Sequence, residues 1–455
     1  MRDDLTTQIE QYTAAVIDRQ RPITSEEAQA SVAAISDPPK VEFRTASRRR
    51  GWLIGVAGAV TVLAVGLLTV LTRGTAPEVP VLSQPSPSPT VATPAPTPSP
   101  TVAAPAPIPS SAVWSAIPGS ALGAGMMTSV TVGGPGLVAV GSTPFGDHPE
   151  DAAVWTSVDG ITWNRIPHDE EVFGGGSMSS VTAGGPGLVA VGSGVWTSAD
   201  GLVWSRVPDD DGMFDDVWMK SVTVGGPGLV AVGDAGEGAA VWTSVDGIVW
   251  SRVPHDEATF GGTPDGGPSM WHVTEGEPGL VAVGIDWSSP FDADAVVWTS
   301  VDGFIWTRVP HDEEVFGGSG HQAISGVTAA GPGLVAVGVE RSTNMQGVIW
   351  TSVDGLTWTR VAGDESGSLD AGQMNSVAVG DSGLVAVGWI GRVGGPYSDA
   401  AVWTSGDGIV WTRVPHDDEA IGSGLMWDLI NTDSGLVAVG SDGMDAAVWV
   451  TGLED

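Results

Sequence analysis

Residues 136–163, GLVAVGSTPFGDHPEDAAVWTSVDGITW, contain two short motifs that recur along the second part of the chain. One is the hexapeptide GLVAVG, and the other is a VW or IW pair followed by Thr-Ser, an Asp-Gly dipeptide and another Trp. The hexapeptide begins at Gly136, Gly187, Gly228, Gly279, Gly333, Gly383 and Gly435. Its spacing, from 41 residues (187 to 228) to 54 residues (279 to 333), indicates a repeat protein whose neighbouring units share one core.

The first repeat is predicted to hold four strands, because apolar and β-branched runs alternate with turn signals. Its Asp159–Gly160 dipeptide, which lies between two such runs, is a strong hairpin signal. The expected strands are SVTV (129–132), LVAVG (137–141), AVWTS (153–157) and ITWNRIP (161–167). Four antiparallel strands repeated seven times predict an all-β fold, a seven-bladed β-propeller.

The two ends of the repeat region complement each other. The seventh repeat stops after its third strand, AAVWVTG at 446–452, while an additional fourth strand, AVWSAIP at 112–118, precedes the first repeat. We therefore expect the N-terminal strand, with Trp114, to complete the last blade and close the ring. Closure removes the open sheet edges that an incomplete ring would leave.

Connection lengths differ between the two sides of the predicted disc. The turns after the first and third strands keep a constant length, whereas the loops after the second and fourth strands vary. Because these two kinds of connection emerge on opposite sides, we name a turn face (in the first repeat, 134–135 and 158–162) and a loop face (142–152 and 166–177). Binding residues concentrate on variable loops held by a rigid scaffold, so function is expected on the loop face.

The hairpin SVDGITW at 157–163 resembles the Asp-box of BNR-repeat propellers, a group that includes sialidases. It has one residue fewer between Asp and Trp than the usual Ser-x-Asp-x-Gly-x-Thr-Trp. In that family Ser and Asp bond the turn and Trp packs in the core. The resemblance implies this structural role for Ser157, Asp159, Trp163, Ser198, Asp200, Trp204, Ser244, Asp246, Trp250, Ser300, Asp302, Trp306, Ser352, Asp354, Trp358, Ser405, Asp407 and Trp411.

The resemblance does not extend to sialidase chemistry, which would need an arginine triad and a tyrosine nucleophile paired with an acid. The propeller region has one tyrosine, Tyr397. Six of its eight arginines follow a fourth-strand Trp by two residues, which places them on outermost strands. Only Arg341 and Arg392 remain, so a triad cannot be built.

A membrane anchor is predicted upstream of the propeller. Residues 52–72 form a run of 21 residues without a charge, and a helix of that length would rise about 31 Å, close to the ~30 Å hydrocarbon core of a bilayer. Arg48, Arg49 and Arg50 precede the run and Arg73 alone follows it, so the N-terminus should be cytoplasmic and the propeller extracytoplasmic. The expected domains are a cytoplasmic segment (1–50), a single-pass transmembrane helix (51–73), a Pro/Ser/Thr/Ala-rich linker (74–111) and the propeller (112–455).

The net charge of the chain, −36, comes from the propeller region, because residues 1–111 carry as many basic as acidic side chains. A surface this acidic repels phosphate backbones, which argues against nucleic-acid binding. Most of the acids fall on the loop face, which should favour cations or a basic partner. The absence of Cys excludes thiol catalysis and Cys-based metal sites.

Loop-face residues supply the candidate sites. The ligand-binding candidates are Trp389, Arg392, Tyr397 and Arg341, since aromatic and Arg side chains dominate binding hot spots. The densest carboxylate cluster, a candidate for calcium, is Asp209, Asp210, Asp211, Asp215 and Asp216. Four Pro-His-Asp-Glu/Asp segments, at His168, His255, His311 and His416, lie in different blades and are interpreted as polar loop starts.

An apolar residue stands three positions before the first-strand Val or Leu in every repeat: Met127, Met178, Met219, Met270, Ile324, Met374 and Met426. We interpret this ring as packing between blades near the mouth of the channel.

These observations favour a monomeric, non-enzymatic binding or scaffold module of the cell envelope, with an envelope protein or glycan as partner. One alternative is a glycan-active hydrolase or lyase of the BNR-repeat type that uses loop carboxylates. A second alternative is a calcium-stabilised structural head. Paired acids near the channel would favour the hydrolase, and metal-dependent melting would favour the structural head.

Overall fold

The computed structural model describes residues 113–452 except 118, 144–150, 210–211, 237, 262–266, 288–292, 319, 332, 343–344, 364–366 and 392–397. The cytoplasmic segment, the membrane span and the linker predicted upstream lie outside the described residues. No helix within the described ranges is long and apolar enough to cross a membrane.

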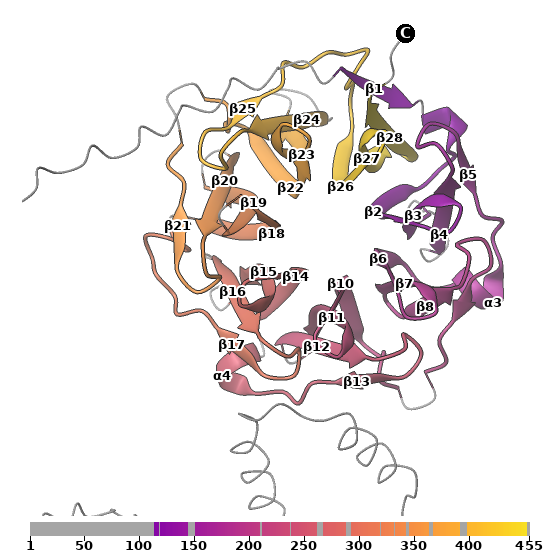
Figure 1. Ribbon diagram of the computed structural model, residues 1–455, viewed down its shortest axis with the longest axis horizontal. Coiled ribbons are helices and arrows are strands. Elements are labelled where there is room, and N and C mark those ends of the chain that lie inside the picture. Colours follow the sequence, from indigo (N-terminus) through magenta and orange to yellow (C-terminus); the bar gives the residue numbers. More distant parts are fainter. Residues whose placement is uncertain are drawn as a thin grey trace, which may run out of the picture. The chain divides into compact units, whose positions relative to one another are not determined.

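Seven four-stranded antiparallel sheets surround a central axis (Figure 1). Blade 1 has β2 (Met126–Gly133), β3 (Gly136–Ser142), β4 (Ala152–Ser157) and β5 (Trp163–Arg165). Blade 2 has β6 (Met178–Gly184), β7 (Gly187–Gly192), β8 (Val195–Ser198) and β9 (Ser205–Arg206). Blade 3 has β10 (Val217–Gly225), β11 (Gly228–Ala235), β12 (Gly238–Ser244) and β13 (Trp250–Arg252).

The remaining blades repeat this order. Blade 4 has β14 (Pro268–Gly276), β15 (Gly279–Asp286), β16 (Asp294–Ser300) and β17 (Trp306–Arg308). Blade 5 has β18 (His321–Ala330), β19 (Gly333–Arg341), β20 (Met345–Ser352) and β21 (Trp358–Arg360). Blade 6 has β22 (Gly372–Gly380), β23 (Gly383–Gly391), β24 (Ser398–Ser405) and β25 (Thr412–Arg413). Blade 7 combines β26 (Leu425–Thr432), β27 (Gly435–Asp442) and β28 (Asp445–Thr451) with β1 (Trp114–Ile117).

The ring closes as the sequence predicts, and the all-β seven-bladed propeller is confirmed. Strand β1 pairs antiparallel with β28, with Trp114 opposite Thr451. The Trp114 side chain is 3% exposed and packs among apolar residues of blades 6 and 7. The chain therefore enters the propeller beside the C-terminal end of β28, its last strand.

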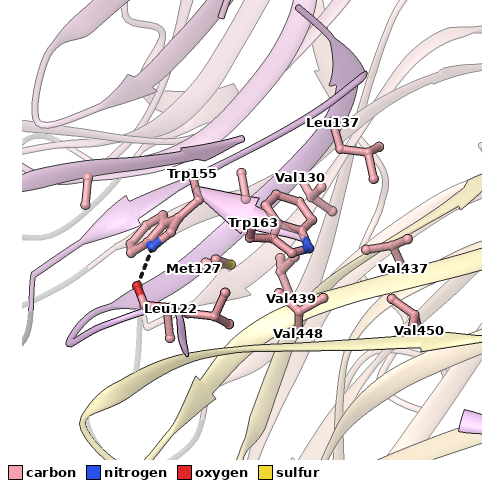
Figure 2. Packing of buried hydrophobic residues seen from close by; sticks show 13 residues of the cluster. Leu122, Met127, Val130, Leu137, Trp155, Trp163, Val437, Val439, Val448 and Val450 are labelled. Atoms are coloured by element: carbon pink, nitrogen blue, oxygen red, sulfur yellow. Dashed lines mark hydrogen bonds between the residues drawn. The ribbon is translucent and has the colours of Figure 1, made fainter. Parts of the chain in front are cut away.

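The interfaces between blades form the core, because each sheet is apolar on both faces. At the blade 7–blade 1 interface, Met127 and Trp155 lie in one buried cluster with Val439 and Val448 of blade 7 (Figure 2). The indole Nε1 of Trp155 donates a hydrogen bond to the carbonyl of Leu122 at 3.0 Å. Six of the seven residues in the predicted Met ring are 0% exposed and Met178 is 1% exposed, which agrees with packing between blades.

Tight turns set the twist and the close contact of neighbouring blades on the turn face. In blade 1, Gly133 pairs with Gly136 across a two-residue turn. Gly134 in this turn has φ +58°, and a Cβ there would lie 2.7 Å from the carbonyl oxygen of Asp200 in blade 2. A glycine is therefore required by both the backbone conformation and the neighbouring blade.

Outside the sheets the described residues form only short helical segments. These are the 3-10 turn η2 (Gly119–Ala121) and the four-residue helices α3 (Glu170–Phe173) and α4 (Glu257–Phe260). Both α helices follow an outer strand and bury one Phe each, so they anchor the loops between blades.

Candidate functional site

Every innermost strand contains a β-bulge at the same place, directly after the Met-ring residue. In β2, for example, Met127 pairs with Gly141 and Ser129 pairs with Val140, which leaves Thr128 as the extra residue. The register shifts in the same way in the other six inner strands. The bulged residues are Thr128, Ser179, Lys220, Trp271, Ser325, Asn375 and Trp427.

These seven bulged residues line one cavity of about 180 Å³. The inner strands that carry them surround the centre of the disc in Figure 1. Each bulge lies in the first half of its strand, and each inner strand begins at a loop between blades. The cavity is therefore at the loop-face end of the central channel, and we call it the channel-mouth pocket. A bulge re-aims a side chain without interrupting the sheet, so each blade contributes its bulged residue to this pocket.

The residue after each bulge has a structural task in most blades. The hydroxyls of Ser129, Ser180 and Ser221 accept hydrogen bonds of 3.2–3.3 Å from a backbone amide of the following blade. In blade 7 the carboxylate of Asp428 takes this role, accepting from the Val130 amide at 2.9 Å. Its other oxygen accepts from the Ser376 hydroxyl at 3.0 Å. These bonds tie successive blades together around the pocket.

Two aromatic side chains and several polar side chains line the pocket. Trp271 of blade 4 and Trp427 of blade 7 are partly buried lining residues. Four buried polar atoms of the lining have no hydrogen-bond partner among the described residues: Trp271 Nε1, Trp427 Nε1, His272 Nδ1 and Ser325 Oγ. Buried polar atoms without a partner are uncommon in native proteins, and their concentration in the residues around this pocket makes it the candidate site.

The charged groups of the pocket already have partners. The ammonium group of Lys220 lies 2.7 Å from the Asp234 carboxylate, and it also donates to the Ser269 hydroxyl at 3.0 Å. The same nitrogen lies 5.7 Å from the ring centroid of Trp271. Burial lowers the pKa of His272, and the Asp428 carboxylate opposes that shift only in part. His272 is therefore favoured as the neutral imidazole, and the pocket demands no counter-ion.

An exposed indole extends the site toward the loop face. Trp218 directly precedes the Met-ring residue of β10 and is 46% exposed. Its Nε1 donates a 2.8 Å hydrogen bond to the hydroxyl of Ser179, a lining residue of the pocket. The ring is thus fixed in place by a hydrogen bond while its apolar surface stays open to solvent.

Two of the predicted ligand-binding candidates lie behind the pocket wall. Arg341 at the end of β19 donates to the side-chain oxygen of Gln373, a buried lining residue. Trp389 of β23 pairs with the same Gln373 across the sheet. The Gln373 amide donates to Asn375 at 2.8 Å, so Arg341 is connected to the pocket through one side chain. The other two candidates, Arg392 and Tyr397, lie outside the described residues.

The predicted calcium cluster is only partly described. Asp209 accepts hydrogen bonds from the backbone amides of Met213 and Phe214, at 2.7 and 3.0 Å. Both of its oxygens are thus engaged in shaping the loop. Asp215 and Asp216 are exposed, and Asp210 and Asp211 lie outside the described residues.

The Pro-His-Asp-Glu segments pair with acids of their own blade. His168 Nε2 lies 3.1 Å from Glu170 and 3.9 Å from Asp151. His311 forms the matching group with Asp294 and Glu313. Each group could hold a metal ion with three ligands, but the glutamates and histidines are exposed and nothing else in these groups points to an ion.

The turns between third and fourth strands share one hydrogen-bond pattern. In blade 1 the Ser157 hydroxyl accepts from the Gly160 amide at 2.8 Å, and Asp159 Oδ1 accepts from the Thr162 and Ile161 amides at 2.7 and 2.9 Å. These two backbone amides lower the pKa of the Asp159 carboxyl. The Trp163 indole donates back to the Gly160 carbonyl at 2.8 Å. The same Gly amide–Ser, paired amide–Asp and Trp–Gly bonds recur in the five other complete turns.

Sequence reasoning found the Met ring but missed the pocket beside it. The missed residues differ from blade to blade, so the repeat alignment alone gives no reason to group them. A usable signal exists: the position directly after an invariant apolar residue varies between Thr, Ser, Lys, Trp and Asn. Variation at one fixed position of a rigid repeat is typical of a surface that contacts a ligand.

Comparisons with known proteins bear on the architecture only. No family model matches the chain, and no curated protein matches it. Among solved structures, the GH43 endo-arabinanase from Bacillus licheniformis is 13% identical, with 51% of this chain and 92% of that chain covered and a TM-score of 0.31. The Dos1 propeller is 9% identical, with 74% and 95% covered and a TM-score of 0.42. At these values nothing about the activity of this chain follows from the activities of those proteins.

Proposed function

We propose that this protein is a non-enzymatic glycan-binding module, held at the cell membrane by residues 52–72 and displayed outside the cytoplasm. In this proposal the channel-mouth pocket binds one sugar residue of a neutral glycan. The single observation that carries it is the meeting of two indole side chains with hydroxyl, amide and imidazole side chains around one small cavity.

The chemistry of the pocket supports a polyhydroxylated ligand. A sugar ring has apolar C–H faces that stack on indoles, and hydroxyl groups that bond to hydroxyl and amide side chains such as those of the lining. A cavity volume of about 180 Å³ leaves room for a small ligand of about the size of one sugar ring. Trp218 on the rim would then stack a second sugar unit.

The charge state of the pocket supports a neutral ligand. Lys220 is paired with Asp234, and Asp428 accepts from an amide and a hydroxyl. An anionic sugar would have to compete with Asp234 for Lys220, while also approaching the acidic loop face. Neutral glycans meet neither obstacle.

The lining supports binding over hydrolysis. Glycoside hydrolysis generally uses two carboxyl groups on either side of the scissile bond. Among the described lining residues one carboxylate occurs, that of Asp428, and both of its oxygens are engaged in contacts between blades. The hydrolase or lyase therefore remains the second candidate function, with its acids to be sought in the loops.

Two further proposals concern the relationship of the turns to Asp-box propellers and the binding of cations or a basic partner by the loop face. The six turn hydrogen-bond patterns support kinship with Asp-box propellers in the structural part of the motif. The acidic loop face, with Asp209, Asp215 and Asp216, supports attraction of calcium or a basic protein surface, which would weaken as salt rises.

The test uses the full chain in lipid nanodiscs on an array of immobilised neutral and anionic glycans. We expect binding to a neutral subset, and the variants Trp427→Ala and Trp271→Ala should weaken it about 10- to 100-fold. The matched control is Trp287→Ala, because Trp287 is also a loop-face indole, 40% exposed, but does not line the pocket.

Equal binding by all three variants would show that glycans bind elsewhere. Absence of binding to any neutral glycan would reject the proposal. Cleavage of an arrayed glycan that persists in Asp428→Asn would favour the hydrolase alternative with loop acids.

A further inference from the structure

Exposed apolar side chains are concentrated on the turn face. The described part of the chain has 21 large apolar residues that are exposed. Fourteen of them are in the six turns that follow the third strands: Val158, Ile161, Leu202, Val203, Val245, Ile248, Val249, Val301, Phe304, Ile305, Val353, Leu356, Ile409 and Val410. So many exposed apolar side chains on one face of the disc mark that face as a contact surface.

The turns hold these side chains outward by their own hydrogen bonds. In blade 4, Asp302 accepts from the amides of Phe304 and Ile305, and the Ser300 hydroxyl accepts from the Gly303 amide. The Phe304 and Ile305 side chains are left 52% and 70% exposed. Since the same pattern recurs in six blades, the apolar groups are projecting tips in a ring and do not form a groove.

Neighbouring turns join into one surface. A Cβ on Gly201 would lie 3.2 Å from the Pro135 ring, so the outer turn of blade 2 lies against the inner turn of blade 1. Val132, Val224 and Val379, at the turn-face ends of inner strands, add exposed apolar groups nearer the centre. A ring of projecting tips without a groove suits a deformable partner better than a peptide, which usually binds in a groove or along a sheet edge.

The chain enters the propeller on this same face. Trp114 pairs with Thr451 at the end of β28, and in the other blades this end of the third strand leads into the apolar turn. Val113, the described residue before β1, is 67% exposed. The chain upstream of Val113, which includes the predicted membrane span, is therefore attached to the apolar face.

We infer that the turn face docks on the surface of the lipid bilayer, with the apolar tips among the headgroups. The tether keeps the propeller within reach of the bilayer and joins it on the side that carries the tips. Docking would leave the loop face and the channel-mouth pocket directed away from the membrane. This inference rests on the predicted membrane anchor and is independent of the glycan proposal.

The charges of the turn face select among lipids. Each of the six turns carries an aspartate, and backbone amides lower the pKa of these carboxyl groups in turns such as those of Asp200 and Asp354. The face therefore stays anionic at neutral pH. We expect docking on zwitterionic lipid and weaker docking on anionic lipid, most clearly at low salt.

The experiment uses the full chain reconstituted in phosphatidylcholine vesicles, alone or mixed with phosphatidylglycerol. The chain has no cysteine, so Val249→Cys and Ile305→Cys each give a single labelling site on the turn face, and Ser342→Cys gives one on the loop face. A polarity-sensitive label at 249 or 305 should be quenched by nitroxide lipids. At 342 the label should instead be quenched by aqueous iodide, about threefold more strongly than at 249 or 305.

A second variant guards against effects of the label itself. With the label at Val203→Cys, the substitutions Val249→Ser and Ile305→Ser should reduce the quenching by nitroxide lipids, because two of the fourteen apolar side chains of the turns are lost. Equal iodide quenching on both faces would overturn the inference. If the turn-face label is protected from iodide but is not quenched by nitroxide lipids, and the protection increases with protein density in the vesicles, the face binds a second copy of the chain instead. Failure of the chain to float with the vesicles would remove the anchor and the inference together.

Discussion

The outer turns and the inner bulges of this propeller are both repeated in every complete blade, yet they differ in what is repeated. In the outer turns the side chains recur, because Ser, Asp and Trp each make a bond that shapes the turn. At the inner bulges the backbone recurs while the side chain changes from Thr to Ser, Lys, Trp and Asn.

This difference separates the residues of a repeat that stabilise the fold from those that are free to bind a ligand. A residue whose neighbours lie in its own blade is held constant, because each blade meets the same packing problem. A residue that faces the axis lies among side chains that differ from blade to blade. The same packing constraint therefore does not recur at the bulge positions. Removing a turn residue should therefore cost folding stability, whereas changing a bulge residue should change binding.

Ring closure is the largest expected effect. Trp114 is 3% exposed, and its strand supplies the fourth member of blade 7. Trp114→Ala should lower the free energy of unfolding by about 3–5 kcal/mol, because it leaves a cavity between blades. Deleting 112–118 should be worse, since it also opens a sheet edge.

Urea unfolding of the full chain, followed by tryptophan fluorescence, measures the loss. Trp287→Ala is the matched control, since this indole is 40% exposed and should cost under about 1 kcal/mol. Similar midpoints for the two variants would contradict closure by β1.

Removing one hydroxyl from a turn and one from a bulge tests directly whether the two positions differ in their contribution to stability. In blade 3 the buried Ser244 hydroxyl accepts from the Gly247 amide at 2.8 Å and donates to the Val249 carbonyl at 2.6 Å. Ser244→Ala should cost about 1–3 kcal/mol, because it leaves two backbone groups without partners. Ser325→Ala removes a bulge hydroxyl that has no partner among the described residues, and it should change stability by under about 0.5 kcal/mol.

Thermal melting of the two variants compares them under one condition. Losses of equal size at Ser244 and Ser325 would show that the bulge positions also stabilise the fold, and the separation of tasks would fail.

The fold could be predicted from the sequence because its causes are local and repeated. Asp159–Gly160 and Gly134–Pro135 specify turns by their own chemistry, and six or seven copies remove the ambiguity of any one of them. Closure could be predicted because an orphan strand with Trp114 matches a missing one. The pattern also predicted that the Met ring would be buried.

The pocket could not be predicted because its bulged residues lie about 40 to 55 residues apart in the sequence and meet only across the axis. A bulge leaves no mark in strand propensity, so Lys220 and Trp271 read as ordinary strand residues. Arg341 and Trp389, two of the predicted ligand-binding residues, lie next to the pocket, because Arg341 contacts Gln373 of its lining and Trp389 pairs with Gln373 across the sheet. They hold a lining residue in place and do not line the pocket themselves.

The smallest effect concerns His272, which occupies the position where blades 1, 2 and 3 have a serine that bonds the next blade. Burial lowers the pKa of His272, with the Asp428 carboxylate opposing the shift, so the folded state favours the neutral ring. As pH falls below about 6.5, the unfolded chain takes up this proton before the folded chain does. The stabilising contribution is thus complete above the unfolded pKa and is lost as pH falls toward the folded pKa, with a slope of at most about 1.4 kcal/mol per pH unit.

His272→Ser should remove this part of the pH dependence between about pH 7 and 5, because the serine does not titrate. The variant also places at position 272 the serine that blades 1, 2 and 3 have there. In blade 3, for example, Ser221 bonds the next blade by accepting from the Val273 amide at 3.2 Å. The variant should therefore keep its stability at pH 7 and exceed the native chain at pH 5, as measured by urea unfolding at both values. If both chains lose the same stability on acidification, His272 is not held neutral by its surroundings. In that case one of the four unpartnered atoms that define the pocket would belong to a charged group, and a neutral ligand would lose its best support.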